Sequence, residues 1–114
     1  MTILHLALAS DWDAARQTGE YRVSTIGRSL DDVGFIHACA DHEQLRGVVK
    51  RFYRDVGAPL VLLDVDPTGL DVRMEEAPGD PPEVFPHIYG PLPVSAVISV
   101  LPFTPPGPLG RGSQ

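Results

Sequence analysis

The sequence contains a single cysteine, Cys39, in 114 residues. One thiol excludes an intramolecular disulfide, and it also excludes a cysteine-based zinc site within one chain. The fold must therefore be stabilised by an apolar core. The hydrophobic content of 43% is that of an ordinary globular protein, and a chain of this length buries roughly two-thirds of its unfolded surface. We expect one globular domain.

Basic residues are few, because 9 Lys and Arg face 15 Asp and Glu and give a net charge of −6. The basic side chains are scattered along the chain. Nucleic acids and anionic membranes are bound by basic patches, so we expect neither as a partner. A small anionic ligand held by one or two arginines remains compatible with this charge.

Long apolar runs and common catalytic motifs are also missing. No run approaches the roughly 20 residues that span a bilayer, and the N-terminus lacks the basic start and apolar centre of a signal peptide. We therefore expect a cytoplasmic protein. The chain has no P-loop, no dinucleotide fingerprint, no HExxH and no GxSxG, so no standard motif names a reaction.

The apolar pattern predicts an α+β fold with short strands. Strands are expected at residues 2–9, 20–24, 35–39, 60–65, 70–75 and 94–101. We expect 70–75 to return antiparallel to 60–65 and 94–101 to be largely buried. Residues 25–34 and 77–83 are expected to be loops. The domain is expected to cover residues 1–102, and the Pro- and Gly-rich residues 103–114 to be a poorly ordered tail.

Two helices are predicted. Ser10 is the expected N-cap of the first, which buries Trp12 and Ala15 and ends at Gly19. The second is predicted over residues 41–54. Asp41, with a glutamine three residues later, resembles a capping box. The helical spacing of the apolar residues behind it predicts an inward face, made of Leu45, Val48, Val49 and Phe52.

Three histidines lie among apolar or backbone-constraining residues: His5, His37 and His87. An imidazole in such a setting is costly unless a partner satisfies it. Each ring is therefore either a core histidine that is hydrogen-bonded to the backbone or a member of a ligand cleft. In an extended segment His87 shares a face with Tyr89. The two prolines and the glycine of residues 85–92 fit a ligand clamp or a structural corner equally well.

Other candidates are weaker. Arg73 and Glu75 share a face of a predicted strand, and they either form a solvated sheet edge or project into the cleft. Arg28 and Ser29 lie in a predicted loop and could bind an anion. Cys39 shares a face with His37, which allows a thiol nucleophile, although a small buried side chain is the simpler interpretation.

These residues together resemble an uncharacterised bacterial family, domain of unknown function 952. The matching features are listed in chain order: His5, Trp12, Ala15, Gly19, Tyr21, Ser29, Leu30, Gly34-Phe35-Ile36-His37 and Phe85-Pro86-His87-Ile88-Tyr89-Gly90-Pro91-Leu92. The resemblance covers residues 2 to about 102. It implies a fold similar to the ADP-ribosyltransferase superfamily, in which two small antiparallel sheets enclose a cleft that holds NAD in active members.

The resemblance also implies roles for two residues: His5 and His37 would be the cleft histidines that bind the ribose side of an NAD-like ligand. For an enzyme that acts on a nucleotide or ribosyl ligand, we further expect His87 as a third site histidine and Tyr21 or Tyr89 to stack on a base. Phosphate contacts are then expected from Arg28, Ser29 or Arg73. The final-strand glutamate of classical ADP-ribosyltransferases has no counterpart, because residues 94–101 contain no acid.

Three function classes therefore stay open. The first is an enzyme that processes a ribosyl or nucleotide ligand. The second is a binding or accessory domain that has kept the cleft and lost the transferase chemistry. The third is a metal hydrolase of zinc type that uses His5, His37 and His87 as ligands.

Overall fold

The computed structural model describes residues 2–77 and 82–105, which form an α+β fold of small antiparallel sheets and three α-helices. In chain order the elements are β1 (Ile3–Leu8), α1 (Ala9–Thr18), β2 (Glu20–Tyr21), β3 (Val23–Thr25), β4 (Arg28–Ser29), α2 (Leu30–Val33), β5 (Ile36–His37), α3 (His42–Val48), the π-helix η1 (Val49–Tyr53), β6 (Leu60–Val65), β7 (Asp71–Ala77), β8 (Glu83–Tyr89), β9 (Leu92–Pro93), the 3₁₀-helix η2 (Val94–Ala96) and β10 (Val97–Phe103). Within the described ranges no helix has the length and apolar character needed to cross a membrane.

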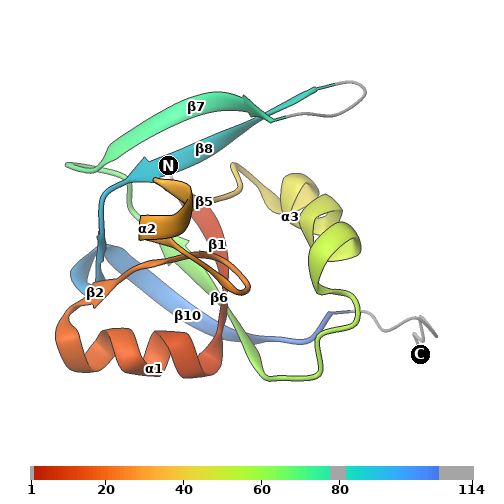
Figure 1. Ribbon diagram of the computed structural model, residues 1–114, viewed down its shortest axis with the longest axis horizontal. Helices are drawn as coiled ribbons and strands as arrows, with labels where there is room; N and C mark the ends of the chain where they lie inside the picture. The colour runs from red at the N-terminus through yellow and green to blue at the C-terminus, as the bar shows by residue number, and fades with distance from the viewer. Residues whose placement is uncertain (1, 78–81, 106–114) are drawn as a thin grey trace.

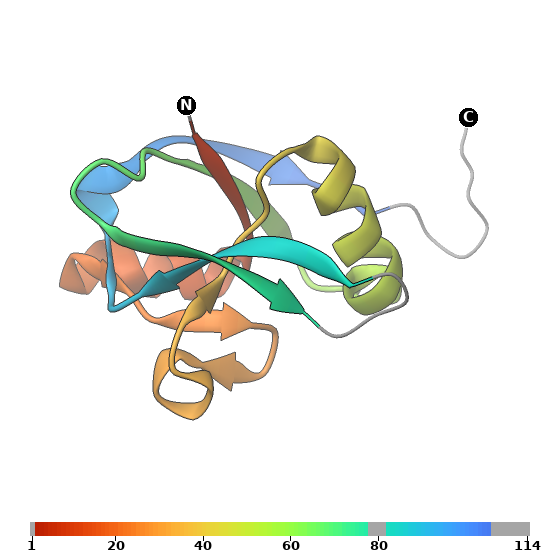
Figure 2. The same cartoon turned by 90° about the horizontal axis from the view of Figure 1, so that it is seen from above.

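Two three-stranded sheets organise the molecule, in the orders β1-β6-β10 and β5-β8-β7. Two short ribbons, β2-β9 and β3-β4, complete the pairing, and all pairs are antiparallel. Figure 1 shows the β7–β8 ribbon along the top, α1 at the bottom and α3 at the right. Seen from above, the segment with β3, β4 and α2 projects from one side (Figure 2).

The prediction that residues 70–75 return along 60–65 is wrong. Strand β6 is already paired on both sides, with β1 and with β10. After the turn at residues 66–69, in which the Leu70 N–H donates to the Pro67 carbonyl, the chain therefore leaves this sheet. Strand β7 pairs instead with β8, which places Arg73 directly opposite His87.

Strand β1 separates two apolar cores. Ile3 and Ala7 belong to one core and Leu4 and Leu6 to the other, which explains why this strand is apolar on both faces. Leu4 also exchanges two backbone hydrogen bonds with Cys39, at 2.8 and 2.7 Å. These bonds join the first sheet to the segment that follows β5.

The first helix differs from its prediction at its start. It begins at Ala9, with Leu8 at the N-cap and no side-chain capping bond, so Ser10 is not the cap. Its other predicted features are confirmed, since Trp12 and Ala15 are buried and Gly19 ends the helix at φ 92°. A residue in this left-handed region is most easily a glycine.

Residues 25–34 are not the loop that the sequence predicted. They contain β4 and the four-residue α2, whose N-cap Ser29 forms a capping box with Asp32. A helix of one turn has too few residues to produce a periodic apolar signal. Its only buried residue is Leu30.

The second predicted helix is confirmed at its start and revised at its end. Asp41 accepts a hydrogen bond from the Gln44 N–H at 2.9 Å. From Val49 the chain becomes a π-helix, whose wider turn changes the inward face. Tyr53 is consequently 3% exposed, whereas Phe52, predicted to face inward, is 59% exposed.

The final strand also differs from its prediction. Residues 94–96 form η2, and β10 runs from 97 to 103 along the edge of the first sheet. Ile98 and Leu101 are 60% and 56% exposed, so the segment is not largely buried. An apolar alternation alone does not separate an edge strand from a central one. Residues 106–114 of the predicted tail and residues 78–81 of the predicted loop lie outside the described ranges.

Candidate functional site

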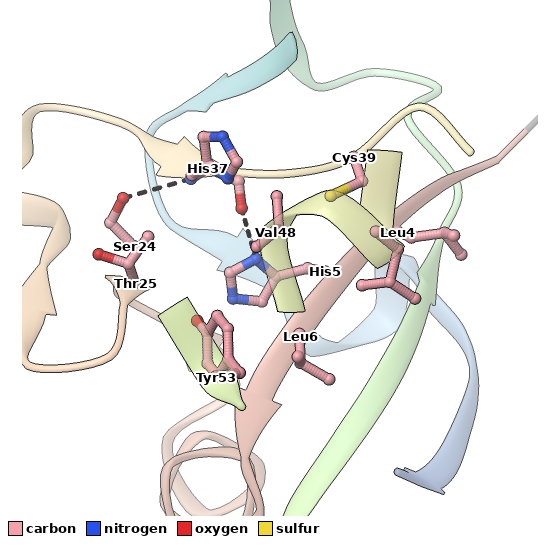
Figure 3. Close-up of a pocket in the computed structure, with 10 residues that line it drawn as sticks. Leu4, His5, Leu6, Ser24, Thr25, His37, Cys39, Val48 and Tyr53 are labelled. Atoms are coloured by element: carbon pink, nitrogen blue, oxygen red, sulfur yellow. Dashed lines mark hydrogen bonds between the residues drawn. The ribbon is translucent and has the colours of Figure 1, made fainter. Parts of the chain in front are cut away.

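One pocket lies where β1, β3, β5, α3 and η1 meet (Figure 3). It is lined by Leu4, His5, Leu6, Ser24, Thr25, His37, Cys39, Leu45, Val48 and Tyr53. About 10 Å³ of it is open to a water-sized molecule, and its empty volume including the open mouth is about 220 Å³. The closed part has room for about one water molecule.

His5 is a buried histidine with both ring nitrogens engaged. Its Nδ1 lies 2.6 Å from the His37 carbonyl oxygen, and its Nε2 lies 2.9 Å from the Tyr21 hydroxyl. A carbonyl only accepts, so Nδ1 carries the proton and Nε2 accepts from Tyr21. Burial lowers the pKa of His5 to about 4. The ring is therefore neutral at neutral pH.

Tyr21 lies in the apolar core and is 1% exposed. Its ring meets the His5 ring edge-on at a centroid distance of 5.1 Å, and Trp12 lies 6.4 Å away. Burial raises the pKa of Tyr21. Tyr21 was predicted to stack on a base. In the structure its hydroxyl is bonded to His5 and the Tyr21 ring is covered by protein.

His37 connects three parts of the site. Its backbone N–H donates to the Ser24 hydroxyl at 3.2 Å, and its carbonyl holds the His5 ring (Figure 3). Its ring lies 4.7 Å from the Phe85 ring and 5.6 Å from the His87 ring, between centroids. Burial, followed by the nearby His87, lowers the pKa of His37 to about 4. This imidazole is also neutral at neutral pH.

Sequence reasoning missed three of the polar residues that line the pocket: Ser24, Thr25 and Tyr53. The first two belong to a three-residue strand, and nothing in their spacing distinguishes them from surface residues. Tyr53 reaches the pocket because η1 is a π-helix, a distortion that is frequent at functional sites. The apolar spacing of residues 45–52 is that of a regular α-helix and carries no sign of this distortion.

Cys39 lines the same pocket and is 3% exposed. Burial, with Asp41 nearby, raises the pKa of its thiol to about 12. A cysteine nucleophile acts as the thiolate, and this thiol stays protonated at neutral pH. The geometry therefore favours the small buried side chain over the nucleophile.

A second polar group lies on the face of the β5-β8-β7 sheet that carries the His37 ring. The β7–β8 cluster consists of Asp71, Arg73, Glu75, His87 and Tyr89. The Nδ1 of His87 lies 2.8 Å from a Glu75 carboxylate oxygen, and the Tyr89 hydroxyl donates to that same oxygen. The Arg73 guanidinium lies 4.2 Å from the centre of the Tyr89 ring. These alternating positions share one face, as the sequence predicted.

Phe35 covers the His87 ring from one side. The two rings are stacked at a centroid distance of 3.8 Å and an angle of 12°, and His87 is 5% exposed. The hydrogen bonds from Tyr89 and His87 hold the pKa of Glu75 below its usual range. Glu75 is therefore an ionised acceptor for the two donors beside it.

The predicted anion-binding residues of the loop before Gly34 do not join this group. The Ser29 hydroxyl accepts the Asp32 N–H at 3.2 Å as the cap of α2. Arg28 is exposed, and neither residue lines the pocket. Of the predicted phosphate contacts, only Arg73 lies beside a candidate histidine.

The metal alternative finds no support in the described part of the chain. No group of three or more His, Cys, Asp or Glu side chains in residues 2–77 and 82–105 is arranged to hold a metal ion. His5 in particular has no free ring nitrogen, whereas a zinc ligand needs one. His5, His37 and His87 thus do not form a three-histidine site.

Known proteins share both the sequence and the fold of this chain. A search of the curated proteins gives no match. The crystal structure of protein CC0527 from Caulobacter crescentus is similar, with 32% identity and a TM-score of 0.76, over 91% of this chain and 87% of that one. The solution NMR structure of CC0527 has a TM-score of 0.67 at 32% identity, over 87% and 81% of the two chains. A family model described as "Protein of unknown function (DUF952)" matches residues 6–100, and the chain therefore belongs to the DUF952 family.

Proposed function

We propose that this protein binds the ribosyl part of a nucleotide-like ligand, such as NAD or ADP-ribose, in the pocket beside His37. The observation that supports this most is the combination of polar and neutral groups in that pocket. Ser24, Thr25 and Tyr53 supply hydroxyls, and the pKa of His37 near 4 leaves its ring uncharged at neutral pH.

Neutral hydrogen-bonding groups suit the hydroxyls of a sugar. A phosphate would call for cationic donors such as Arg or Lys, and none lines the pocket. A ribose hydroxyl can both donate to an imidazole nitrogen and accept from a serine or threonine. The pocket chemistry therefore selects the sugar rather than the phosphate of the ligand.

The size of the pocket also indicates that only part of a nucleotide binds inside it. Its closed part has room for about one water molecule, far less than the roughly 300–1,000 Å³ of typical ligand pockets. In this proposal one ribose hydroxyl enters the closed part, and the sugar ring and the rest of the nucleotide lie at its mouth. Tyr89 and Arg73 are the proposed contacts there for a base and a phosphate, whereas Tyr21 serves by holding His5.

The residues favour a protein that binds this ligand and does not convert it. The resemblance to the ADP-ribosyltransferase superfamily supports a ribosyl ligand, and the absence of an acid from β10 argues against its transfer chemistry. Fold likeness alone does not fix an activity. His5 has both nitrogens occupied, so its proposed role is to position His37.

A ribosyl-processing enzyme is the second candidate, and the Glu75–His87 pair is the observation that favours it. A carboxylate beside an imidazole resembles the pairs that accept a proton in general base catalysis. In this form His37 binds the sugar, His87 takes the proton and His5 orients His37. The two candidates differ in whether ligand is consumed.

Thermal-shift measurements with NAD, ADP-ribose and ribose 5-phosphate test the proposal. A ligand that binds only the folded state raises the melting temperature. We expect ADP-ribose or NAD to raise it by several degrees in the wild type and by much less in His37→Gln and Ser24→Ala. Ser95→Ala, an exposed serine in η2, is the control that should keep the full shift.

The outcomes separate the candidates. No shift with any of the three compounds in the wild type would overturn the proposal. A shift in the wild type that His37→Gln and Ser24→Ala both retain would move the site away from this pocket. Ligand consumption followed by chromatography, present in the wild type and lost in His87→Gln, would select the enzyme over the binding protein.

A further inference from the structure

The histidine pair formed by His37 and His87 has an asymmetric environment that the proposed function does not use. Their ring centroids lie 5.6 Å apart, so two positive charges on this pair would repel each other at short range. The surroundings of the two rings decide which one takes a proton. This inference deepens the proposed function and rests on it for the identity of the pocket.

The groups around His87 favour a charge on that ring. Glu75 on β7 places a carboxylate oxygen 2.8 Å from Nδ1. The neighbouring Arg73 is already paired with Asp71, through bonds of 2.9 and 3.2 Å. Glu75 is therefore the carboxylate that remains for His87. The other partner of Glu75 is the Tyr89 hydroxyl, which is a neutral donor.

The groups around His37 favour the neutral ring. No carboxylate is bonded to its imidazole among the described hydrogen bonds and ion pairs, and its backbone contacts go to Ser24 and His5. Burial, then His87 and then Arg51 of η1 lower the pKa of His37; Arg51 also pairs with Glu83 at 3.5 Å. A ligand therefore meets an uncharged ring.

We propose that Glu75 is a positioning residue that draws the single proton of the His37–His87 pair onto His87 and so keeps His37 neutral toward the pocket. Phe35, stacked on His87 at 3.8 Å, limits rotation of that ring. The carboxylate then fixes Nδ1 as the donor. The consequence for recognition is that His37 stays an acceptor for a sugar hydroxyl while the positive charge lies one ring behind it.

Histidine ring ¹⁵N NMR tests the assignment without any ligand. Spectra of the wild type, Glu75→Gln and Glu76→Gln are compared at about pH 6, where an unperturbed histidine is partly charged. The two rings are assigned from His37→Gln and His87→Gln. Glu76 is exposed and points to the opposite face of β7, which makes its variant the matched control.

We expect wild type and Glu76→Gln to show His87 with both nitrogens protonated and His37 with the pattern of a neutral ring. In Glu75→Gln the His87 signals should move toward the neutral pattern. A charged His37 in the wild type, or His87 signals that are unchanged in Glu75→Gln, would overturn the proposal. If Glu75→Gln does not fold, Tyr89→Phe replaces it.

Tyr89→Phe removes the competing donor and leaves the whole carboxylate to His87, so the His87 signals should keep the doubly protonated pattern expected for the wild type in the same buffer. Movement of those signals toward the neutral pattern would contradict the role of Glu75. Adding ADP-ribose to the same wild-type sample separates the two proposals. If the His37 and His87 signals of the wild type stay unchanged on adding ADP-ribose while the His87 signals still change in Glu75→Gln, the proposed function fails and the proton assignment stands.

Discussion

At the scale of single residues, three histidines with similar sequence surroundings have three different environments. His5 is enclosed and bonded at both nitrogens. His37 lines the pocket, and His87 is bonded to a carboxylate under a stacked phenyl ring. The sequence predicts that each ring needs a partner. It cannot say which partner, because Tyr21, Glu75 and Phe35 are brought there by the tertiary fold.

Tyr21→Phe tests the environment of His5. The change removes the hydroxyl that donates to the buried Nε2 and leaves that nitrogen without a partner. An unsatisfied buried acceptor costs about 1–3 kcal/mol, so we expect the free energy of unfolding in urea to fall by that amount. Tyr89→Phe is the control, because its hydroxyl donates to the more exposed Glu75. Equal stability of Tyr21→Phe and the wild type would contradict the bond.

At the scale of elements, predictions succeeded where the signal was local. The strand at residues 60–65, the cap at Asp41 and the helix end at Gly19 all follow from neighbouring residues. Predictions failed where the outcome depended on distant partners. The pairing of β7 was wrong because β10, far along the chain, occupies the free edge of β6. The burial of β10 was wrong because it is an edge strand, and within residues 2–77 and 82–105 its Ile98 and Leu101 stay exposed.

The π-helix reverses which of two neighbouring aromatic residues should matter for stability. α-Helical spacing predicts that Phe52 is the buried one, whereas the π-helix buries Tyr53. Tyr53→Ala removes a side chain that is 3% exposed, whereas Phe52→Ala removes one that is 59% exposed. We expect about 3–5 kcal/mol of lost stability for Tyr53→Ala and about 0.5 kcal/mol or less for Phe52→Ala, both from urea unfolding. A regular α-helix through residue 53 would give the opposite order, and that result would rule out the π-helical turn.

At the scale of the whole molecule, the candidate site draws on five elements: β1 and β5 of the two three-stranded sheets, β3 of a short ribbon, α3 and η1. Its histidines were predictable, because an imidazole among apolar residues is conspicuous in a sequence. Ser24 and Thr25 were not, since ordinary hydroxyls in a short strand become informative only when the pocket is formed. The same site holds two neutral imidazoles, of which His5 is buried and His37 is half-buried, and this links the stability of the fold to pH.

Stability should therefore fall as the pH drops from about 6.5 toward about 4. The pKa of His5 and of His37 is about 4 in the folded protein and 6.5 for an unperturbed histidine, so the unfolded chain binds more protons in this window. Stability then rises with pH there, by on the order of 3 kcal/mol for a fully buried ring. The carboxylates with lowered pKa values, Asp66, Asp71 and Glu75, act mainly below this window.

Urea unfolding at a series of pH values checks this slope. His37→Gln removes one of the two rings, and we expect it to reduce the loss of stability between neutral pH and about pH 4 to roughly half. His42→Gln is the matched control, since His42 is exposed at the start of α3, and its pH dependence should equal that of the wild type. A wild-type stability that is flat across the window would mean that the two rings are hydrated or charged in the folded protein. In that case the pocket beside His37 would not be the neutral sugar site on which the proposed function depends.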